Sequence, residues 1–212
     1  MKIALIGATG FIGSKILAEA LLRGHYVTAI ARHIDKLPQH DNLTPKTGDI
    51  TDEAQAVLLF AGHEAVISSF APQGETDQFS AFPKAYQTII NAVKQARVKR
   101  LLVVGGAGSL EIAPGKQVVD SGVIPEEWKP GVLGLREVLN MLRKENDLEW
   151  TFLSPSQVIA PGERTGKFRL GLDALLVDAK GESRISVEDY AVAMIDELEN
   201  PAHTHQRFTV GY

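Results

Sequence analysis

The sequence contains no cysteine and no long apolar run. Without cysteine, the chain can form no disulfide, no thiolate metal site and no cysteine nucleophile. No apolar stretch approaches the roughly 20 residues that a membrane helix needs. The first residues enter a strand-like run directly and do not form a charged and then apolar signal segment. We therefore expect a cytoplasmic protein.

Basic residues are neither in excess nor clustered. The 22 Lys and Arg residues are outnumbered by 26 Asp and Glu residues, which gives a net charge of −4. This balance argues against nucleic acid and against an anionic membrane surface as partners. His203 and His205 lack a third ligand in register, so we expect no metal site. Asp120 and Ser121 lack the strand–turn–helix setting of a hydrolase nucleophile.

Glycine is present where a phosphate-binding turn needs it. Residues 3–13 read IALIGATGFIG, and the stretch 11–22 has its apolar residues on one helical face. Gly7 permits a sharp turn after a buried strand, Gly10 lets the backbone approach a pyrophosphate, and Gly13 lets the next helix pack closely on the sheet. The amides of the first helical turn would then face the phosphates. The flanking strand and helix favour a dinucleotide site over a purely structural glycine turn.

Strand-like and helical patterns alternate along most of the chain. The expected strands are 3–6, 26–31, 43–46, 65–68, 99–104, 149–154 and 206–210, and the expected helices are 11–22, 52–60, 78–97, 132–145 and 186–197. This alternation predicts one α/β domain over residues 1–212, a Rossmann-type doubly wound parallel sheet. The irregular segments 106–130 and 156–186, the second with a hairpin around 179–182, are expected to form the substrate pocket.

The end of the second expected strand carries no acid that would accept a hydrogen bond from the ribose 2′-hydroxyl of NAD. Arg32 stands there instead, and Lys36 follows four residues later. Both side chains suit a 2′-phosphate, which favours NADP over NAD. Asp35 tempers this preference, since an acid at that position could still reach a ribose.

Asp49 and Ile50 follow the third expected strand and are candidates for the adenine. Asp49 would accept from the amino group, and Ile50 would pack on the ring. The alternative is that Asp49 caps the helix that follows, for which Thr51 and Asp52 are the other candidates.

On these residues, the chain resembles the atypical short-chain dehydrogenase/reductase group, in particular NAD(P)H-binding NmrA-like proteins and the biliverdin reductase B (flavin reductase) type. The resemblance rests on GATGFIG at 7–13, AR at 31–32, GDI at 48–50, AVISSF at 65–70, LLVVGGAGSL at 101–110, EWTFLSPSQV at 149–158 and RISVEDYA at 184–191. It implies coenzyme contacts by Thr9, Gly10, Phe11 and Ile12 at the pyrophosphate, Arg32 and Lys36 at the 2′-phosphate, Asp49 and Ile50 at the adenine, Ser68, Ser69 and Phe70 at the ribose, and Gly105, Gly106, Pro155, Ser156 and Gln157 near the nicotinamide.

The Tyr-x-x-x-Lys pair of the wider superfamily is absent. No tyrosine has a lysine four residues later, whether Tyr26, Tyr86, Tyr190 or Tyr212. A Ser-Tyr-Lys carbonyl mechanism is therefore disfavoured. A flavin or quinone needs only to be stacked on the nicotinamide and shielded from competing reactions.

Few side chains are candidates for the acceptor. The aromatic residues Phe70, Trp128 and Phe168 could stack on it, and each also suits ordinary packing. Ser109 is the candidate catalytic residue, as a donor to a substrate oxygen, and its alternative role is a turn-stabilising hydroxyl.

These observations predict an NADP(H)-binding reductase that passes hydride to a small acceptor such as a flavin, quinone or carbonyl compound. The alternative is a non-catalytic NADP sensor that reports to a protein partner, which the missing pair favours. A sugar-nucleotide epimerase or dehydratase is disfavoured by the chain length and by the same missing pair. A homodimer and a complex with a regulatory protein both stay open.

Overall fold

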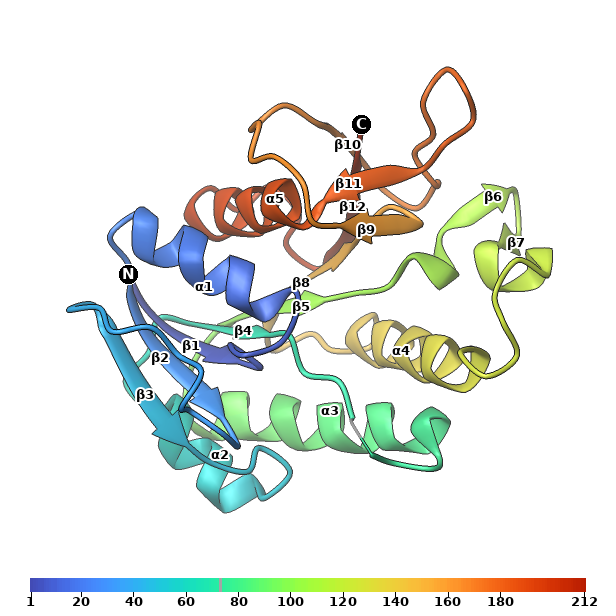
Figure 1. The fold of residues 1–212 in the computed structure, drawn as a ribbon. Coiled ribbons are helices and arrows are strands. Elements are labelled where there is room, and N and C mark those ends of the chain that lie inside the picture. Colours follow the sequence, from blue (N-terminus) through green and yellow to red (C-terminus); the bar gives the residue numbers. More distant parts are fainter. Residues whose placement is uncertain (73) are drawn as a thin grey trace.

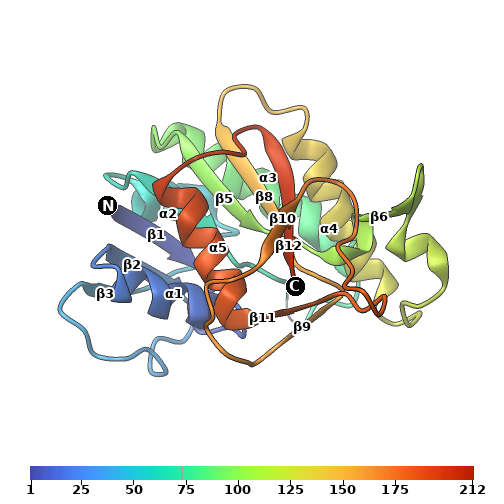
Figure 2. The same ribbon diagram turned by 90° about the horizontal axis from the view of Figure 1, so that it is seen from above.

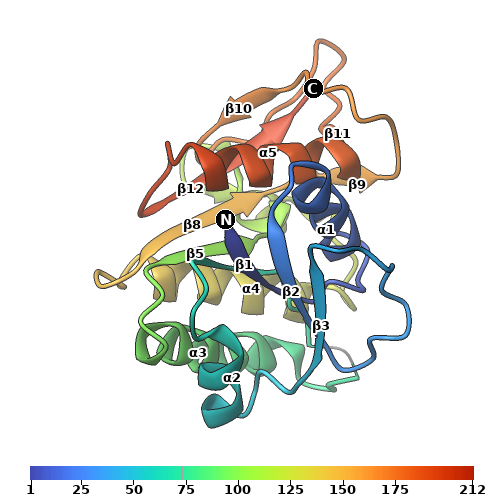
Figure 3. The same ribbon diagram turned by 90° about the vertical axis from the view of Figure 1, so that its left-hand side faces the viewer.

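Eight strands pair into one sheet in the order β10-β12-β8-β5-β4-β1-β2-β3 (Figures 1 and 3). The computed structural model describes residues 1–72 and 74–212. Every neighbouring pair is parallel except β10 and β12, which are antiparallel. The strands are β1 (Lys2–Ile6), β2 (Tyr26–Ala31), β3 (Leu43–Thr47), β4 (Ala65–Ser68), β5 (Arg100–Val104), β8 (Glu149–Ser154), β10 (Arg169–Gly171) and β12 (Gln206–Gly211). The predicted doubly wound parallel sheet is confirmed, with an antiparallel edge strand that the sequence did not indicate.

Helices cover both faces of this sheet. On one face lie α1 (Gly13–Leu22) and α5 (Val187–Glu199), and on the other lie α2 (Glu53–Phe60), α3 (Gln78–Gln95) and α4 (Lys129–Leu142) (Figure 1). Each face has its own apolar core. The first core includes Leu17 and Met194, and the second includes Phe60 and Trp150. Burial on both faces explains why the central strands read as continuous apolar runs.

Two helices begin directly after a residue whose side chain caps them. Asp52 accepts a hydrogen bond from the Gln55 amide at 3.2 Å and thereby caps α2. Ser186 accepts from the Asp189 amide at 3.0 Å and thereby caps α5. In both cases a side-chain oxygen satisfies an amide that has no partner within the helix.

Four helices differ by two or three residues from the expected ranges. The helix α3 ends at Gln95, two residues earlier than predicted, and α5 ends at Glu199, two residues later. The helix α1 begins at Gly13, two residues later than predicted, because residues 7–12 form the turn. The helix α4 begins at Lys129 and ends at Leu142, each three residues earlier than predicted. Pro130 lies in its first turn, where an amide hydrogen has no helical acceptor and its loss costs nothing.

Short elements gather at the carboxyl ends of the parallel strands. There β6 (Glu111–Ala113) pairs with β7 (Lys116–Gln117), β9 (Val158–Ala160) pairs with β11 (Arg184–Ser186), and the 3-10 turns η1 (Ala107–Ser109) and η2 (Val118–Ser121) complete the edge (Figures 1 and 2). The hairpin expected around 179–182 is wrong. The Asp178 amide donates to the Glu182 carbonyl at 2.9 Å and closes a turn, but no paired strands flank it in the described chain.

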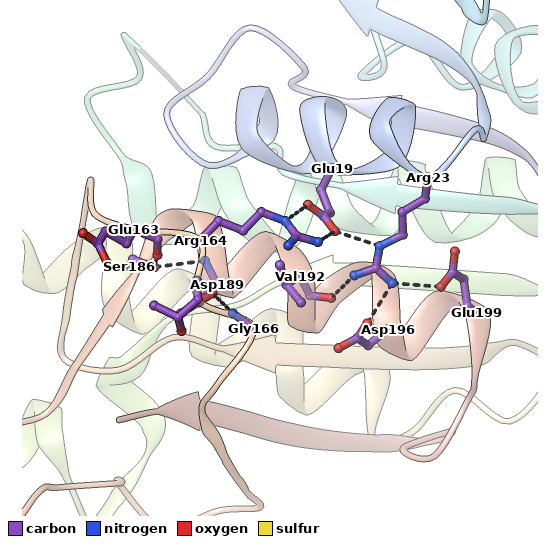
Figure 4. A network of polar contacts seen from close by, with 11 residues as sticks. Glu19, Arg23, Glu163, Arg164, Gly166, Ser186, Asp189, Val192, Asp196 and Glu199 are labelled. Atoms are coloured by element: carbon purple, nitrogen blue, oxygen red, sulfur yellow. Dashed lines mark hydrogen bonds and ion pairs between the residues drawn. The ribbon is translucent and has the colours of Figure 1, made fainter.

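Charged side chains join α1 to α5 and to the loop between β9 and β10 (Figure 4). Glu19 of α1 is only 4% exposed and accepts two hydrogen bonds from Arg164 and one from Arg23, all at 2.7 Å. Arg23 also pairs with Asp196 at 2.7 Å and with Glu199 at 2.8 Å. The hydrogen bonds from Arg164, and next those from Arg23, lower the pKa of Glu19 against the effect of its burial.

Candidate functional site

The glycine turn after β1 has a different steric reason for each glycine. Gly7 has a positive φ of 76°, and a Cβ there would lie 2.5 Å from the Ser69 carbonyl oxygen. A Cβ on Gly13 would lie 2.1 Å from the Gly7 carbonyl oxygen, so only glycine lets α1 approach so closely. A Cβ on Gly10 would meet only that same oxygen, at 3.2 Å. The space above Gly10 is therefore open to a ligand.

The amino end of α1 offers free hydrogen-bond donors. Its N-cap, Ile12, supplies no side-chain acceptor, and no acid stands in the first turn. Within residues 1–72 and 74–212, the amides of Phe11, Ile12 and Gly13 have no protein acceptor. Free amides at the positive end of a helix bind phosphate, so these residues fit the diphosphate of a dinucleotide. Thr9 is half-buried in the same turn.

The loop after β2 carries the residues expected at the coenzyme 2′-phosphate. Arg32, Asp35 and Lys36 are all exposed there. In the part of the chain that the structure describes, Arg32 makes no ion pair. It lies close enough to Asp49 for its charge to contribute to a lowered pKa of that carboxyl.

Asp49 is not the cap of α2. Its Oδ1 accepts from the Thr51 amide at 2.9 Å and from the Thr51 hydroxyl at 2.7 Å, and these bonds are the main cause of the lowered pKa of Asp49. Asp52 provides the cap instead. The side chain of Ile50 is 5% exposed and belongs to the core that contains Phe60. Ile50 is therefore buried as a whole residue, and the neighbouring Asp49 is the exposed one of the two.

The three residues expected at the ribose lie at the end of β4 and differ in how deeply they are buried. Ser68 is fully buried, and its hydroxyl donates to the Tyr86 hydroxyl at 3.1 Å. Ser69 is half-buried and donates its amide to the Ile6 carbonyl at 3.0 Å. Phe70 is half-buried and packs edge-on against Tyr86. Ser69 and Phe70 therefore lie nearer to the surface than Ser68, whose hydroxyl serves the core.

The residues expected near the nicotinamide follow β5 and β8, which are neighbours in the sheet. A Cβ on Gly105 would lie 2.2 Å from the Phe152 ring, so the chain passes very close to β8 there. Ser156 is buried, and its hydroxyl donates to the Val210 carbonyl at 2.8 Å. Pro155 is buried and Gln157 is exposed. The side chain of Ser156 is therefore bonded to β12.

A cavity of about 340 Å³ opens beside the end of β5. Its walls come from the two ends of the 106–130 excursion, from the facing parts of α3 and α4 and from one residue of β8. The lining residues are Gln78, Phe82, Gly106, Ala107, Gly108, Ser109, Glu127, Trp128, Gly131, Val132, Leu135, Arg136 and Phe152. We call it the acceptor pocket. Of the three aromatic candidates, only Trp128 lines it. Phe168 packs against the core between the sheet, α1 and α5.

The structure adds residues that the sequence did not indicate. Gln78, Phe82 and Arg136 line the acceptor pocket from two helices, which no local motif connects. Segment 156–186 contributes none of its lining residues, whereas it lines a second cavity of about 380 Å³ together with residues 111–114. The lining residues from the two helices meet because α3 and α4 pack closely at their amino ends, where a Cβ on Gly134 would lie 2.8 Å from the Gln78 carbonyl oxygen.

No tyrosine lines the acceptor pocket in the described residues. Tyr86 and Tyr190 are fully buried, and burial raises the pKa of both phenols. Tyr212 donates to Asp189 at 2.8 Å, and Tyr26 is exposed at the amino end of β2. The missing Tyr-x-x-x-Lys pair is therefore not replaced by a tyrosine from elsewhere in the fold.

Known proteins share this arrangement. A sequence profile described as NAD(P)H-binding matches residues 7–201. The chain belongs to this NAD(P)H-binding family. The predicted kinship with the atypical short-chain dehydrogenase/reductase group is likewise confirmed. In residues 1–72 and 74–212, no helix of this family member combines the length and apolar character needed to cross a membrane.

Three relatives cover nearly the whole chain. The uncharacterized protein YwnB of Bacillus subtilis is 39% identical over 213 residues, which span 99% of this chain and 98% of YwnB. A Bacteroides thetaiotaomicron protein, provisionally named an epimerase, is 50% identical with a TM-score of 0.93 over 100% of this chain and 96% of its own. A Streptococcus pneumoniae protein, provisionally named an NADH-flavin reductase, is 34% identical with a TM-score of 0.88 over 100% and 99%.

Proposed function

We propose that this chain is an NADPH-dependent reductase whose acceptor is a small planar molecule such as a flavin or quinone. The observation that carries the proposal is the acceptor pocket beside Gly106, next to the strand end where the family resemblance puts the nicotinamide. Most of its walls are apolar, and its volume of about 340 Å³ is in the range of small-molecule sites. The name of the Streptococcus pneumoniae relative agrees with this choice.

Each part of the site has a role in this proposal. The free amides of Phe11, Ile12 and Gly13 hold the diphosphate, and Arg32 with Lys36 binds the 2′-phosphate. When bound, the coenzyme supplies the hydride. The walls of the acceptor pocket align the acceptor and shield it from competing reactions. A flavin or quinone that has received the hydride needs one further proton, which solvent supplies.

The epimerase name of the Bacteroides relative fits this site less well. Epimerisation of a sugar nucleotide oxidises a hydroxyl and reduces it again. Both steps need a positioned acid–base group that takes up the hydroxyl proton and returns it. In the described chain, no tyrosine lines the acceptor pocket. The missing Tyr-x-x-x-Lys pair therefore favours an acceptor that needs no such group.

The second candidate function is a non-catalytic NADP sensor. The observation in its favour is the same missing pair, since coenzyme binding alone requires only the glycine turn and the basic loop. As a sensor, the chain would act through a regulatory partner or through a homodimer, and NADP would alter that association.

A turnover assay separates the two functions. The protein is mixed with NADPH and with a panel of flavins and quinones, and the loss of absorbance of NADPH is followed. Acceptor-dependent oxidation that saturates with acceptor supports the reductase. Tight NADPH binding with no oxidation by any acceptor would reject it and leave the sensor.

A further inference from the structure

We infer that the acceptor carries an anionic group and that Arg136 binds this group in the acceptor pocket. The inference rests on the proposed function, because it names the chemistry of the molecule that this pocket accepts. Arg136 lies on α4, lines the pocket and is half-buried. It thus acts as a specificity residue for the acceptor.

The guanidinium of Arg136 has no acidic partner among the described residues. Its hydrogen bond goes from Nη1 to the neutral Oε1 of Gln117, at 3.2 Å. By contrast, Arg143, which directly follows the same helix, pairs with Asp173 at 3.0 Å. An arginine keeps its charge in proteins, so Arg136 brings an uncompensated positive charge to the pocket wall.

The surroundings make an anion the preferred partner of this charge. Leu135, Val132 and Phe152 form apolar walls, where water solvates a charge less well than in bulk solvent. A carboxylate, phosphate or sulfonate can accept charge-assisted hydrogen bonds from a guanidinium, often two at once. The side chain of Gln117 also accepts from the backbone of η2, which holds this end of the pocket in place.

The end of the pocket away from Arg136 carries an aromatic and an acidic residue. Trp128 and Glu127 lie at the amino end of α4, and Trp128 precedes Arg136 by eight positions, which is about 12 Å along the helix axis. Glu127 is exposed, so its charge is screened by solvent. A flat acceptor that contacts Trp128 would therefore place its anionic substituent toward Arg136 and away from Glu127.

Two matched acceptors test this assignment. The ratio of kcat/KM for 1,4-naphthoquinone-2-sulfonate to kcat/KM for neutral 1,4-naphthoquinone is measured with NADPH for the wild-type protein, Arg136→Gln, Arg136→Lys and Arg97→Gln. Arg97 is exposed and follows the carboxyl end of α3, whereas Gln78 of the pocket stands at the amino end of that helix. Arg97→Gln removes the same charge there and serves as the control. Because the chain has no cysteine, neither quinone can alkylate a thiol. Comparing ratios cancels the different reduction potentials of the two quinones.

We expect the ratio to fall at least tenfold in Arg136→Gln, less in Arg136→Lys, and not at all in Arg97→Gln. A ratio in Arg136→Gln equal to that of the wild type overturns the inference and leaves the reductase function intact. A second measurement does not need turnover: the sulfonate is titrated into the NADP⁺-saturated proteins. Binding that weakens at least tenfold in Arg136→Gln supports the inference even if no acceptor is reduced, whereas equal binding overturns it.

Discussion

Arg207 of β12 donates hydrogen bonds to both the hydroxyl and the carbonyl oxygen of Ser109, which precedes it by 98 residues. Nη1 donates to the Ser109 hydroxyl at 3.3 Å and Nη2 to the carbonyl at 3.4 Å, while Nε donates to Asp173 at 2.8 Å. The Arg207 side chain is 2% exposed. Because Arg207 occupies a lone pair of the Ser109 oxygen, the hydroxyl hydrogen stays available to the acceptor pocket that Ser109 lines.

Replacing Ser109 decides between its two suggested roles. We expect Ser109→Ala to lower kcat about tenfold or more, because the acceptor loses a hydrogen bond to the negative charge that develops on it, with the dissociation constant of NADPH unchanged. The free energy of unfolding should fall by only about 1 kcal/mol, because Arg207 keeps Asp173 and the carbonyl. Ser121→Ala is the matched control, since that hydroxyl donates to the Val118 carbonyl at 2.6 Å within a turn. Equal kcat values in the two variants would leave Ser109 as a turn-stabilising residue.

The phosphate turn could be predicted from the sequence because its causes are local. Gly13 is required by its contact with Gly7 in the same strand–turn–helix unit, and Gly7 has a positive φ in the turn itself, although its Cβ would also meet the more distant Ser69. The apolar run of the strand and the periodicity of the helix around them can be recognised in the sequence. The same holds for Asp52 and Ser186, whose caps act over three residues.

The acceptor pocket could not be predicted because its causes are distant. Phe82 and Arg136 meet at the pocket only because α3 and α4 pack side by side under the sheet. Ser68 shows that a residue in an expected position can still direct its side chain elsewhere. It stands at a strand end where the family resemblance expects a coenzyme contact, yet its hydroxyl is bonded to Tyr86 in the core. Which way a side chain faces at a strand end depends on the helix packed below it.

Substitutions of Gly10 and Gly13 should separate coenzyme binding from folding. We expect Gly10→Val to fold and to bind NADPH at least tenfold more weakly, because the added side chain occupies the open space above the turn. Gly13→Ala should lower the free energy of unfolding by about 2 kcal/mol or more, since its Cβ would collide with backbone. Urea unfolding without coenzyme and NADPH fluorescence titrations measure the two effects. Undiminished NADPH binding by Gly10→Val would contradict the diphosphate site.

Arg32 should determine the preference between the two coenzymes. A charge-assisted hydrogen bond contributes about 1.5–3 kcal/mol, so Arg32→Ala should raise the dissociation constant of NADPH by roughly 10- to 150-fold. The dissociation constant of NADH, which lacks the phosphate, should change little. Lys36→Ala is expected to act in the same direction and more weakly, and Arg97→Ala should have no effect. An equal change for NADPH and NADH on removing Arg32 would refute the phosphate contact.

The ion pairs of Glu19 should make part of the stability depend on pH. The hydrogen bonds from Arg164 and Arg23 lower the pKa of this carboxyl below its ordinary value of 4.5 (Figure 4). A depressed carboxyl pKa contributes stability that is present above about pH 4.5 and is lost as the pH falls through the folded-state value.

The free energy of unfolding is therefore measured in urea from pH 7 to pH 3 for the wild-type protein and for Glu19→Gln. We expect the wild type to be more stable at pH 7 and the difference to shrink below about pH 4.5. Glu127→Gln, at an exposed carboxylate, should follow the wild-type curve. A difference between wild type and Glu19→Gln that stays constant over the whole range would mean that the charge of Glu19 contributes nothing and that only its packing matters.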